Sequence, residues 1–318
     1  MKIDLYICSK PLQYLNICNI PCSESVQQKK FLLVYGVFYD SVNFTNNIRK
    51  YDSRWDRVIF CSSNKWFLYV IRYRVNNLFY SVDSTLVGLL HFIKRFNFYL
   101  YEEGAGTYTQ LKIKKRNRWL AAILGTGIVM GTSKYLKGIF VYHPEYYCEQ
   151  IHPQCKVFKF KSAFRQIIKE QSNLFLKISQ STFPKNIQVS NSKILLYLTD
   201  WDYQITVIER MLKLKKKFDF LFIKPHPQRK KEDMPRFDGI DIIYTSMMVE
   251  FLLQFWICNG NEITVMHHNS TAIIPFGGEI QSINLDEKTN ESYDCVLRRL
   301  TELTRLENES FRTSKAIE

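Results

Sequence analysis

Four groups of polar residues with chemically useful side chains each follow a short apolar run. They are Glu102-Glu103-Gly104, Asp200 with Asp202, Lys224-Pro225-His226-Pro227, and Ser270-Thr271 after His267-His268-Asn269. Carboxylates can take a proton from an acceptor hydroxyl. Hydroxyls and backbone N–H groups at the start of a helix favour a phosphate. A histidine held stiffly between two prolines can donate a proton to that phosphate as it leaves. Together the groups indicate transfer of a group from a phosphate-bearing donor to a hydroxyl.

Each group also has an ordinary structural explanation. A glutamate pair before Gly104 is typical of a solvated turn. Ser270 and Thr271 can serve as helix caps, and Asp200 can cap a helix that begins near Trp201. A functional role is favoured over these structural ones because all four groups fall at the ends of expected strands. His267 and His268 are neighbours and are poorly placed to chelate one ion from a helix face, so we predict no metal site.

Strands and helices alternate along the sequence. Strands are expected at 4–8, 31–35, 57–61, 96–101, 194–199, 218–223, 240–244, 262–266 and 281–285. Helices are expected at 11–20, 41–51, 64–75, 203–216, 247–256, 270–275 and 290–307, and a basic helix begins the segment 156–192. This alternation predicts an α/β fold with two Rossmann-like domains facing each other across a cleft. Ligands bind such sheets beyond the carboxyl ends of the strands. We expect domains at 1–185, including a polar linker, and 186–318.

The net charge and the sequence motifs limit the classes of binding partner and of enzyme that are expected. The formal net charge is +14, and cations cluster at 112–118, 213–217 and 228–231. Such charge suits nucleic acid, anionic lipid or an anionic small substrate. No RNA-binding or zinc-finger pattern is present, so nucleic acid ranks lowest. The absence of a Walker loop and of a GxGxxG fingerprint argues against a kinase and a dinucleotide-dependent dehydrogenase.

The cysteines and the apolar runs bear on the compartment. The eight cysteines form no CxxC pair, which is typical of free thiols in a reducing cytoplasm. The longest apolar stretch, 119–131, is too short to span a bilayer, and the first residues alternate like a strand rather than a signal peptide. We therefore expect a cytoplasmic protein, or one held peripherally on the inner face of a bacterial membrane.

The order of the motifs resembles that of bacterial sialyltransferases of glycosyltransferase family 52, which act on lipooligosaccharide and capsule. That family is recognised by an acidic pair before glycine, a His-Pro motif and a Ser-Ser/Thr pair. Here these stand as "YEEGAGTY", "KPHP" and Ser270-Thr271, with 44 residues from His226 to Ser270. The resemblance covers residues 1 to about 290.

The resemblance implies a GT-B fold, CMP-N-acetylneuraminate as donor, inversion at the anomeric carbon, and no metal or other cofactor. The first domain would then be the acceptor side and the second would bind the CMP-sugar. His226 would assist departure of the phosphate that Ser270 and Thr271 hold. Glu250 would bind the ribose, and Lys224 would complement the donor's charge.

The family leaves the general base open in this sequence. Glu102 corresponds to the base of some relatives, with Glu103 beside it. In the lipooligosaccharide type an aspartate before the His-Pro motif serves, and of Asp200 and Asp202 we prefer Asp202. Glutamates stand where many relatives have aspartate, which lengthens the reach by one methylene. The resemblance also assigns substrate contacts to Gly104, Pro227 and, from "SKPLQYLN", Gln13.

The resemblance suggests a terminal galactose acceptor and an α2,3 linkage. One alternative keeps the fold and changes the activity to a polysialyltransferase or another transferase that uses CMP-Kdo or a UDP-sugar. A second alternative is a non-enzymatic capsule-assembly protein that docks on an anionic membrane through residues 112–118 and Trp119. Segment 112–131 is also a candidate for a homodimer interface or an ordinary core helix.

Overall fold

The protein is described here from a computed structural model. It describes residues 2–21, 28–38, 40–62, 65–109, 118–126, 129, 131–179, 187–226, 229, 235–245, 247–286 and 291–315. The chain forms two compact units. The first is Met1–Val37 with Ser41–Ala163, and the second is Phe38–Asp40 with Phe164–Glu318. In the described part of the chain, no helix has the length and apolar character needed to cross a membrane.

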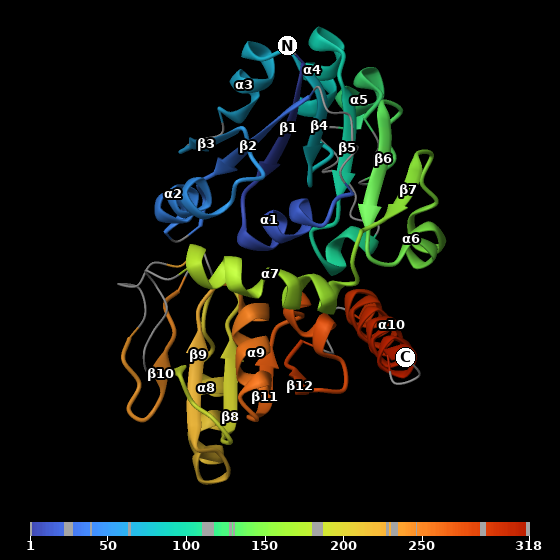
Figure 1. Ribbon diagram of the computed structural model, residues 1–318. Helices are drawn as coiled ribbons and strands as arrows, with labels where there is room; N and C mark the ends of the chain where they lie inside the picture. The colour runs from blue at the N-terminus through green and yellow to red at the C-terminus, as the bar shows by residue number, and fades with distance from the viewer. Residues whose placement is uncertain are drawn as a thin grey trace. The chain divides into compact units, whose positions relative to one another are not determined.

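The first unit is built on a seven-stranded parallel sheet with the order β3-β2-β1-β4-β5-β6-β7 (Figure 1). Its strands are β1 Ile3–Cys8, β2 Lys29–Tyr35, β3 Arg57–Cys61, β4 Val75–Tyr80, β5 Asn97–Tyr101, β6 Leu136–Val141 and β7 Lys156–Lys159. Its helices are α1 Pro11–Cys18, α2 Ser41–Tyr51, α3 Trp66–Arg72, α4 Thr85–Lys94, α5 Arg118–Leu124 and α6 Pro144–Ile151, with a 3-10 helix η1 at Ala105–Tyr108. All six residues of β1 are buried, as expected for a central strand covered on both faces.

Strand β4 is absent from the sequence prediction and begins at Val75, the last residue of the helix predicted at 64–75. Its sequence, VNNLFY, lacks a continuous apolar run because two asparagines interrupt it. In the sheet the Asn77 side chain donates to Asp4 Oδ1 at 2.8 Å and accepts from Asn97 Nδ2 at 2.9 Å. The side chain of Asn77 is thus satisfied by neighbouring strands, which local sequence patterns do not reveal.

Two further strands, β6 and β7, are absent from the sequence prediction. Helix α5 covers only the start of the apolar stretch 119–131, because Gly125 follows it with a φ of +66°. Strand β7 lies where the basic helix was predicted to begin. That helix, α7 at Phe164–Ile178, starts later.

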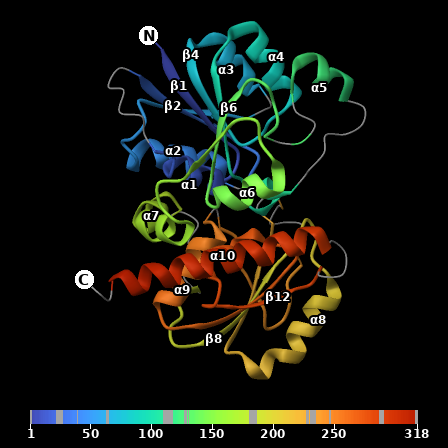
Figure 2. The ribbon, with the colours of Figure 1, turned by 90° about the vertical axis from the view of Figure 1, so that its right-hand side faces the viewer.

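The second unit has a five-stranded parallel sheet with the order β10-β9-β8-β11-β12. The strands are β8 Lys193–Leu198, β9 Phe220–Lys224, β10 Asp241–Ile242, β11 Glu262–His267 and β12 Gln281–Asn284. The helices are α7, α8 Ile205–Leu214, α9 Val249–Cys258 and α10 Glu291–Lys315, with 3-10 helices η5 Lys215–Lys217 and η7 Thr271–Phe276. Helix α10, drawn in red in Figure 2, packs against η7. Apolar side chains of α8 pack on β8, β9 and β11 in one core cluster.

Helix α7 belongs to the second unit by its contacts. Phe175 of α7 stacks on Phe251 of α9 with ring centroids 4.3 Å apart. The division by contacts therefore falls between Ala163 and Phe164. The domain boundary at 185/186 was placed from the polar composition of the linker and stays a prediction.

The segment predicted as a helix at 270–275 is the 3-10 helix η7. Pro275 lies inside it and has no N–H group to donate. The Ser270 hydroxyl accepts a hydrogen bond from the Ala272 N–H at 3.4 Å. Ser270 therefore caps this short helix, one of the structural roles that its residue type allows.

Candidate functional site

The polar segments of the second unit meet along one edge of its sheet. All five strands are parallel, so their carboxyl ends lie together. In spatial order these ends deliver Thr245, Lys224 with His226, Thr199 to Asp202, His267 to Ser270, and Asp286. Segments separated by many residues in the chain thus form one polar edge. This is where ligands bind in open α/β sheets.

Lys224 and Glu250 are a cation and a carboxylate buried at this edge. Lys224 is the last residue of β9, and its Nζ donates to the Thr245 carbonyl at 3.4 Å. Glu250 lies in the first turn of α9. Burial lowers the pKa of Lys224 to about 8 and raises the pKa of Glu250 to about 7, and each charge partly opposes the shift of the other. Burying two charged groups is costly. Groups with pKa values shifted in this way therefore cluster at functional sites, where the shift has a use.

His226 is fixed through its backbone to the neighbouring strand. Its N–H donates to Thr199 Oγ1 at 3.1 Å, and its carbonyl accepts from the Arg229 N–H at 2.9 Å. The ring lies 4.4 Å from the exposed ring of Trp201, at 30°. These contacts give the half-buried His226 a definite position at the end of β9. Pro227 lies outside the described residues.

Asp200 and Asp202 both lie on the exposed loop after β8. Asp202 is 85% exposed and forms an ion pair with Arg229, which also donates to the Trp201 carbonyl at 2.9 Å. The guanidinium lies over the ring of Tyr203. The loop from Asp200 to Tyr203 and the segment after His226 are therefore tied together. The ion pair engages the carboxylate of Asp202 and would compete with its use as a base.

Sequence reasoning missed a carboxylate–imidazole–phenol chain at the same edge. His268 Nδ1 lies 3.0 Å from Asp286 Oδ1, and its Nε2 lies 3.0 Å from Tyr197 Oη. Tyr197 Oη also accepts from the Gln204 N–H at 3.3 Å. The signal in the sequence is that His268 and Asp286 each follow a strand, whereas the sequence prediction treats the histidine pair only as a possible metal ligand. The chain fixes the turn that carries Ser270.

The other histidine of the pair has a structural role. His267 Nδ1 accepts from the Ser270 N–H at 3.2 Å, so the proton is on Nε2, which donates to Ser282 Oγ at 2.7 Å. Burial lowers the pKa of His267 to about 4. A neutral imidazole therefore holds the turn before η7. Asn269 completes the turn with a φ of +49°, a conformation that asparagine tolerates.

Glu102 and Glu103 follow β5 in the first unit and differ in environment. Glu102 is buried, and its Oε2 accepts from Tyr108 Oη at 2.5 Å and from the Tyr142 N–H at 2.9 Å. Burial raises the pKa of Glu102 to about 7. Glu103 is partly exposed and pairs with Lys10 Nζ at 2.6 Å. Of the two carboxylates, Glu103 is the one accessible to a ligand.

The remaining predicted contacts of the first unit are Gly104 and Gln13. Gly104 has a φ of +121°, which only glycine adopts readily, and it leads into η1. Gln13 is buried. Its Oε1 accepts from the Ser9 N–H at 2.6 Å, and its Nε2 donates to Ser81 Oγ at 2.8 Å. Gln13 therefore holds the loop after β1 beside the end of β4, and its amide is already occupied.

A small hollow lies at the polar edge of the second unit. This hollow of about 10 Å³ lies among Lys224, His226, Arg229 and Thr245. This is about the room that one water needs. Among the residues that the structure describes, no group of three or more His, Cys, Asp or Glu side chains is placed to hold a metal ion.

Comparison with solved structures identifies the architecture. No protein-family model matches the sequence, and no curated protein is significantly similar to it. A UDP-N-acetylglucosamine 2-epimerase from Rickettsia bellii matches with a TM-score of 0.54 and 14% identity, over 92% of this chain and 82% of that one. The Methanocaldococcus jannaschii UDP-GlcNAc 2-epimerase, solved with UDP-GlcNAc and UDP, matches with a TM-score of 0.57 and 12% identity. The match covers 96% of this chain and 92% of that one.

The chain has the GT-B fold. At these identities the likeness shows the fold alone, and it confirms the α/β architecture with two Rossmann-like units that the sequence predicts. The assignment to family 52, the donor and the residue roles are not tested by it.

Proposed function

We propose that the protein is a glycosyltransferase that moves N-acetylneuraminic acid from CMP-N-acetylneuraminate to a terminal galactose, with inversion and without a metal ion. The observation that carries the proposal is the buried Lys224–Glu250 pair beside His226 at the carboxyl edge of the second sheet. A fold has no need to bury a cation and a carboxylate there, and the desolvation opposes folding. A charged nucleotide ligand gives the pair a use.

In this proposal each residue has a defined task. His226, positioned by Thr199, donates a hydrogen bond or a proton to the leaving phosphate of CMP. Lys224 complements the charge of the donor, and Glu250 accepts from the ribose hydroxyls. Ser270 and Thr271 offer hydroxyl groups to the phosphate. Since η7 is a short 3-10 helix, its dipole contributes less than the helix that the sequence predicted.

The general base of the proposal is Asp202, with Asp200 on the same loop. Asp202 is exposed and lies next to Trp201, whose ring lies 4.4 Å from that of His226. Its ion pair with Arg229 has to open or turn for it to accept the proton of the acceptor hydroxyl. Glu103 is the second candidate, and Glu102 is buried behind Tyr108 and Tyr142.

A second candidate function is epimerisation of a nucleotide sugar. Both reported structures with the same fold are UDP-GlcNAc 2-epimerases, and one was solved with UDP-GlcNAc and UDP. Such an enzyme would use carboxylates and His226 to move a proton at the sugar ring rather than to activate an acceptor. The two functions differ in donor and in the need for an acceptor.

The test is nucleotide release from a panel of donors. The wild-type protein is given CMP-N-acetylneuraminate, CMP-Kdo or UDP-GlcNAc, with and without lactose, in the presence of EDTA. His226→Ala and Lys224→Met are compared with His152→Asn, a matched control at an exposed histidine in the first unit. His152 has a φ of +51°, which asparagine tolerates.

We expect lactose to stimulate CMP release from CMP-N-acetylneuraminate. His226→Ala should lower the rate by two to four orders of magnitude, which is about the usual effect of losing a general acid. His152→Asn should match wild type. No release from this donor, together with a new sugar isomer formed from UDP-GlcNAc, would replace the transferase by the epimerase. Full activity of His226→Ala would remove His226 from the mechanism.

A further inference from the structure

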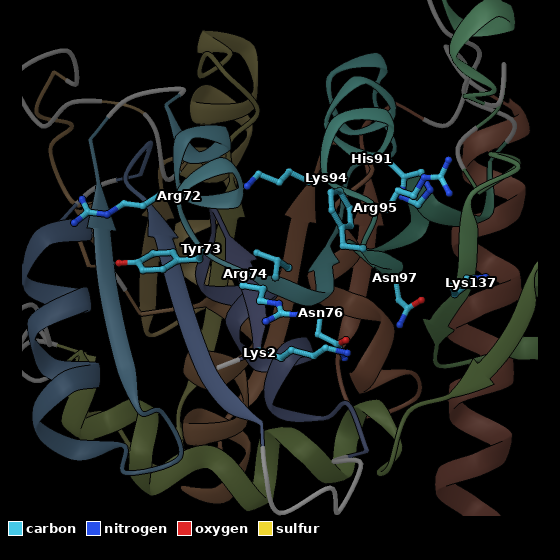
Figure 3. Close-up of a pocket in the computed structure, with 12 residues that line it drawn as sticks. Lys2, Arg72, Tyr73, Arg74, Asn76, His91, Lys94, Arg95, Asn97 and Lys137 are labelled. Atoms are coloured by element: carbon cyan, nitrogen blue, oxygen red, sulfur yellow. The ribbon is translucent and has the colours of Figure 1, made fainter.

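The first unit carries a cationic hollow at the amino ends of its strands, the opposite end of the sheet from Glu102 and Glu103. The hollow has a volume of about 690 Å³, and Figure 3 shows the side chains that line it. Its cations are Lys2, Arg72, Arg74, Lys94, Arg95 and Lys137. Five of them come from the segments before β1, β4 and β5, and Lys137 lies at the start of β6. The parallel sheet thus gathers positive charge from four parts of the chain.

This charge is not neutralised by the protein itself. None of the twelve residues that line the hollow is a carboxylate. Within the described ranges, none of the six cations forms an ion pair, and all six are exposed. Six cations at one end of a sheet repel one another and attract an anionic partner.

Exposed apolar side chains surround the same end of the unit. Helices α3, α4 and α5 lie next to one another there (Figure 1). They carry seven of the thirteen large apolar side chains that are exposed among the described residues. These seven are Leu68, Ile71, Leu89, Phe92, Ile93, Trp119 and Ile123. Phe92 is 80%, Ile123 71% and Trp119 66% exposed. Such a concentration of apolar side chains marks an interaction surface.

Helix α4 joins the two features directly. Leu89, Phe92 and Ile93 are spaced so that they share one helix face. Lys94 and Arg95 follow at once and line the hollow. The cations and the apolar side chains are therefore parts of one surface.

We infer that this surface, the cationic hollow together with the exposed apolar side chains of α3, α4 and α5, docks the protein on an anionic phospholipid membrane. Lipid headgroups of negative charge meet the six cations, while Phe92, Ile93, Trp119 and Ile123 enter the boundary between headgroups and acyl chains. This combination of basic and apolar side chains is what holds peripheral proteins on membranes. The alternative drawn from the sequence places docking at residues 112–118 and Trp119. Trp119 belongs to the surface inferred here, whereas 112–117 lie outside the described residues.

Charge complementarity selects this partner over two others. A two-fold dimer through this surface would set six cations of one copy against the same six of the other, which is repulsive. Nucleic acid would satisfy the cations but would leave the aliphatic side chains of Ile93 and Ile123 without a suitable contact. An anionic bilayer accommodates both features. The inference goes beyond the proposed function and does not depend on it.

The test is co-sedimentation of the full chain with vesicles, measured without any sugar donor. Vesicles of phosphatidylcholine alone are compared with vesicles that also contain phosphatidylglycerol, at low and at physiological ionic strength. A charge variant, Arg72→Gln/Lys94→Gln/Lys137→Gln, is matched by Lys213→Gln/Lys216→Gln/Lys217→Gln in the second unit. The control removes the same charge from exposed lysines elsewhere.

An apolar variant tests the other half of the surface. Phe92→Ser/Ile93→Ser is matched by Val42→Ser/Leu306→Ser, at exposed apolar positions on α2 and α10. Thermal unfolding of all four variants shows whether they are folded. Since every changed side chain is exposed, we expect melting close to wild type.

We expect wild type to bind only the vesicles with phosphatidylglycerol, more weakly as salt is added. Each cation near a membrane contributes about fivefold in affinity, so the charge variant should bind on the order of a hundredfold more weakly. The apolar variant should lose about tenfold or more, and the two controls should bind like wild type. Equal loss in a surface variant and its control would overturn the inference, as would equal binding to neutral vesicles. Tighter binding to a short RNA, unchanged by Phe92→Ser/Ile93→Ser, would assign the cations to nucleic acid instead.

Discussion

Replacing the buried Glu102 by glutamine should change how the stability of the protein depends on pH. The carboxyl group is enclosed by Tyr108 and Tyr142 and is almost inaccessible to solvent. Burial raises its pKa from 4.5 to about 7. The folded state therefore holds the proton more tightly than the unfolded state does. As the pH rises above the unfolded pKa, the group destabilises the fold, and the full cost is present above the folded pKa.

The magnitude follows from these two pKa values. The full cost is about 3 kcal/mol, and about 2.5 kcal/mol of it develops between about pH 5 and pH 8. Glu102→Gln removes the titration and keeps one oxygen that can accept from Tyr108 and the Tyr142 N–H. The free energy of unfolding of wild type, minus that of the variant, should therefore fall by about 2.5 kcal/mol from pH 5 to pH 8. Other titrating groups are common to both proteins and cancel in the difference.

The measurement is urea unfolding of both proteins at the two pH values. Glu103→Gln is the matched control, since Glu103 is the adjacent carboxylate and is partly exposed in its ion pair with Lys10. Exposed pairs contribute less than about 1 kcal/mol, so this variant should stay close to wild type at both pH values. The prediction is contradicted if the free energy of unfolding of wild type, minus that of Glu102→Gln, stays constant or rises with pH. The two hydrogen bonds to Glu102 would then outweigh the effect of its burial.

Two substitutions in the second unit test its packing. Arg165 is buried, pairs with Glu279 at 2.9 Å and lies over the ring of Phe276. Arg165→Ala should lower the free energy of unfolding by about 3 kcal/mol or more, measured by urea unfolding, because Glu279 loses its partner. A methyl group on Gly277 would lie 2.7 Å from the Thr301 carbonyl oxygen. Gly277→Ala should therefore cost about 2 kcal/mol and lower the melting temperature, measured by circular dichroism.

The matched control for Arg165 is Arg299→Ala, which removes an exposed ion pair with Glu302. It should change the free energy of unfolding by less than about 1 kcal/mol. An equal effect of the two arginine substitutions would contradict the assigned role of burial. An unchanged melting temperature for Gly277→Ala would show that η7 and α10 separate at little cost.

Much of the fold could be predicted from the sequence because its signals are local. The apolar runs at 57–61 and 262–266 coincide with β3 and with most of β11, and the helix at 41–51 is α2. Strand β4 escaped prediction because the side chain of Asn77, in its middle, is satisfied by Asp4 and Asn97 on neighbouring strands. Strand β7 escaped because four residues with two lysines give too weak a pattern.

The sequence by itself determined that polar residues follow the strands, and it placed His226 at the end of one of them. Only the tertiary structure decided which of these residues meet. The strand order sets Lys224 beside the first turn of α9, and it joins His268 to Tyr197 and to Asp286. It also separates two adjacent glutamates, Glu102 inside the unit and Glu103 at its surface. The physical reason is that residue type fixes what a side chain can do, whereas burial and neighbours fix its charge, and both depend on segments distant in the chain.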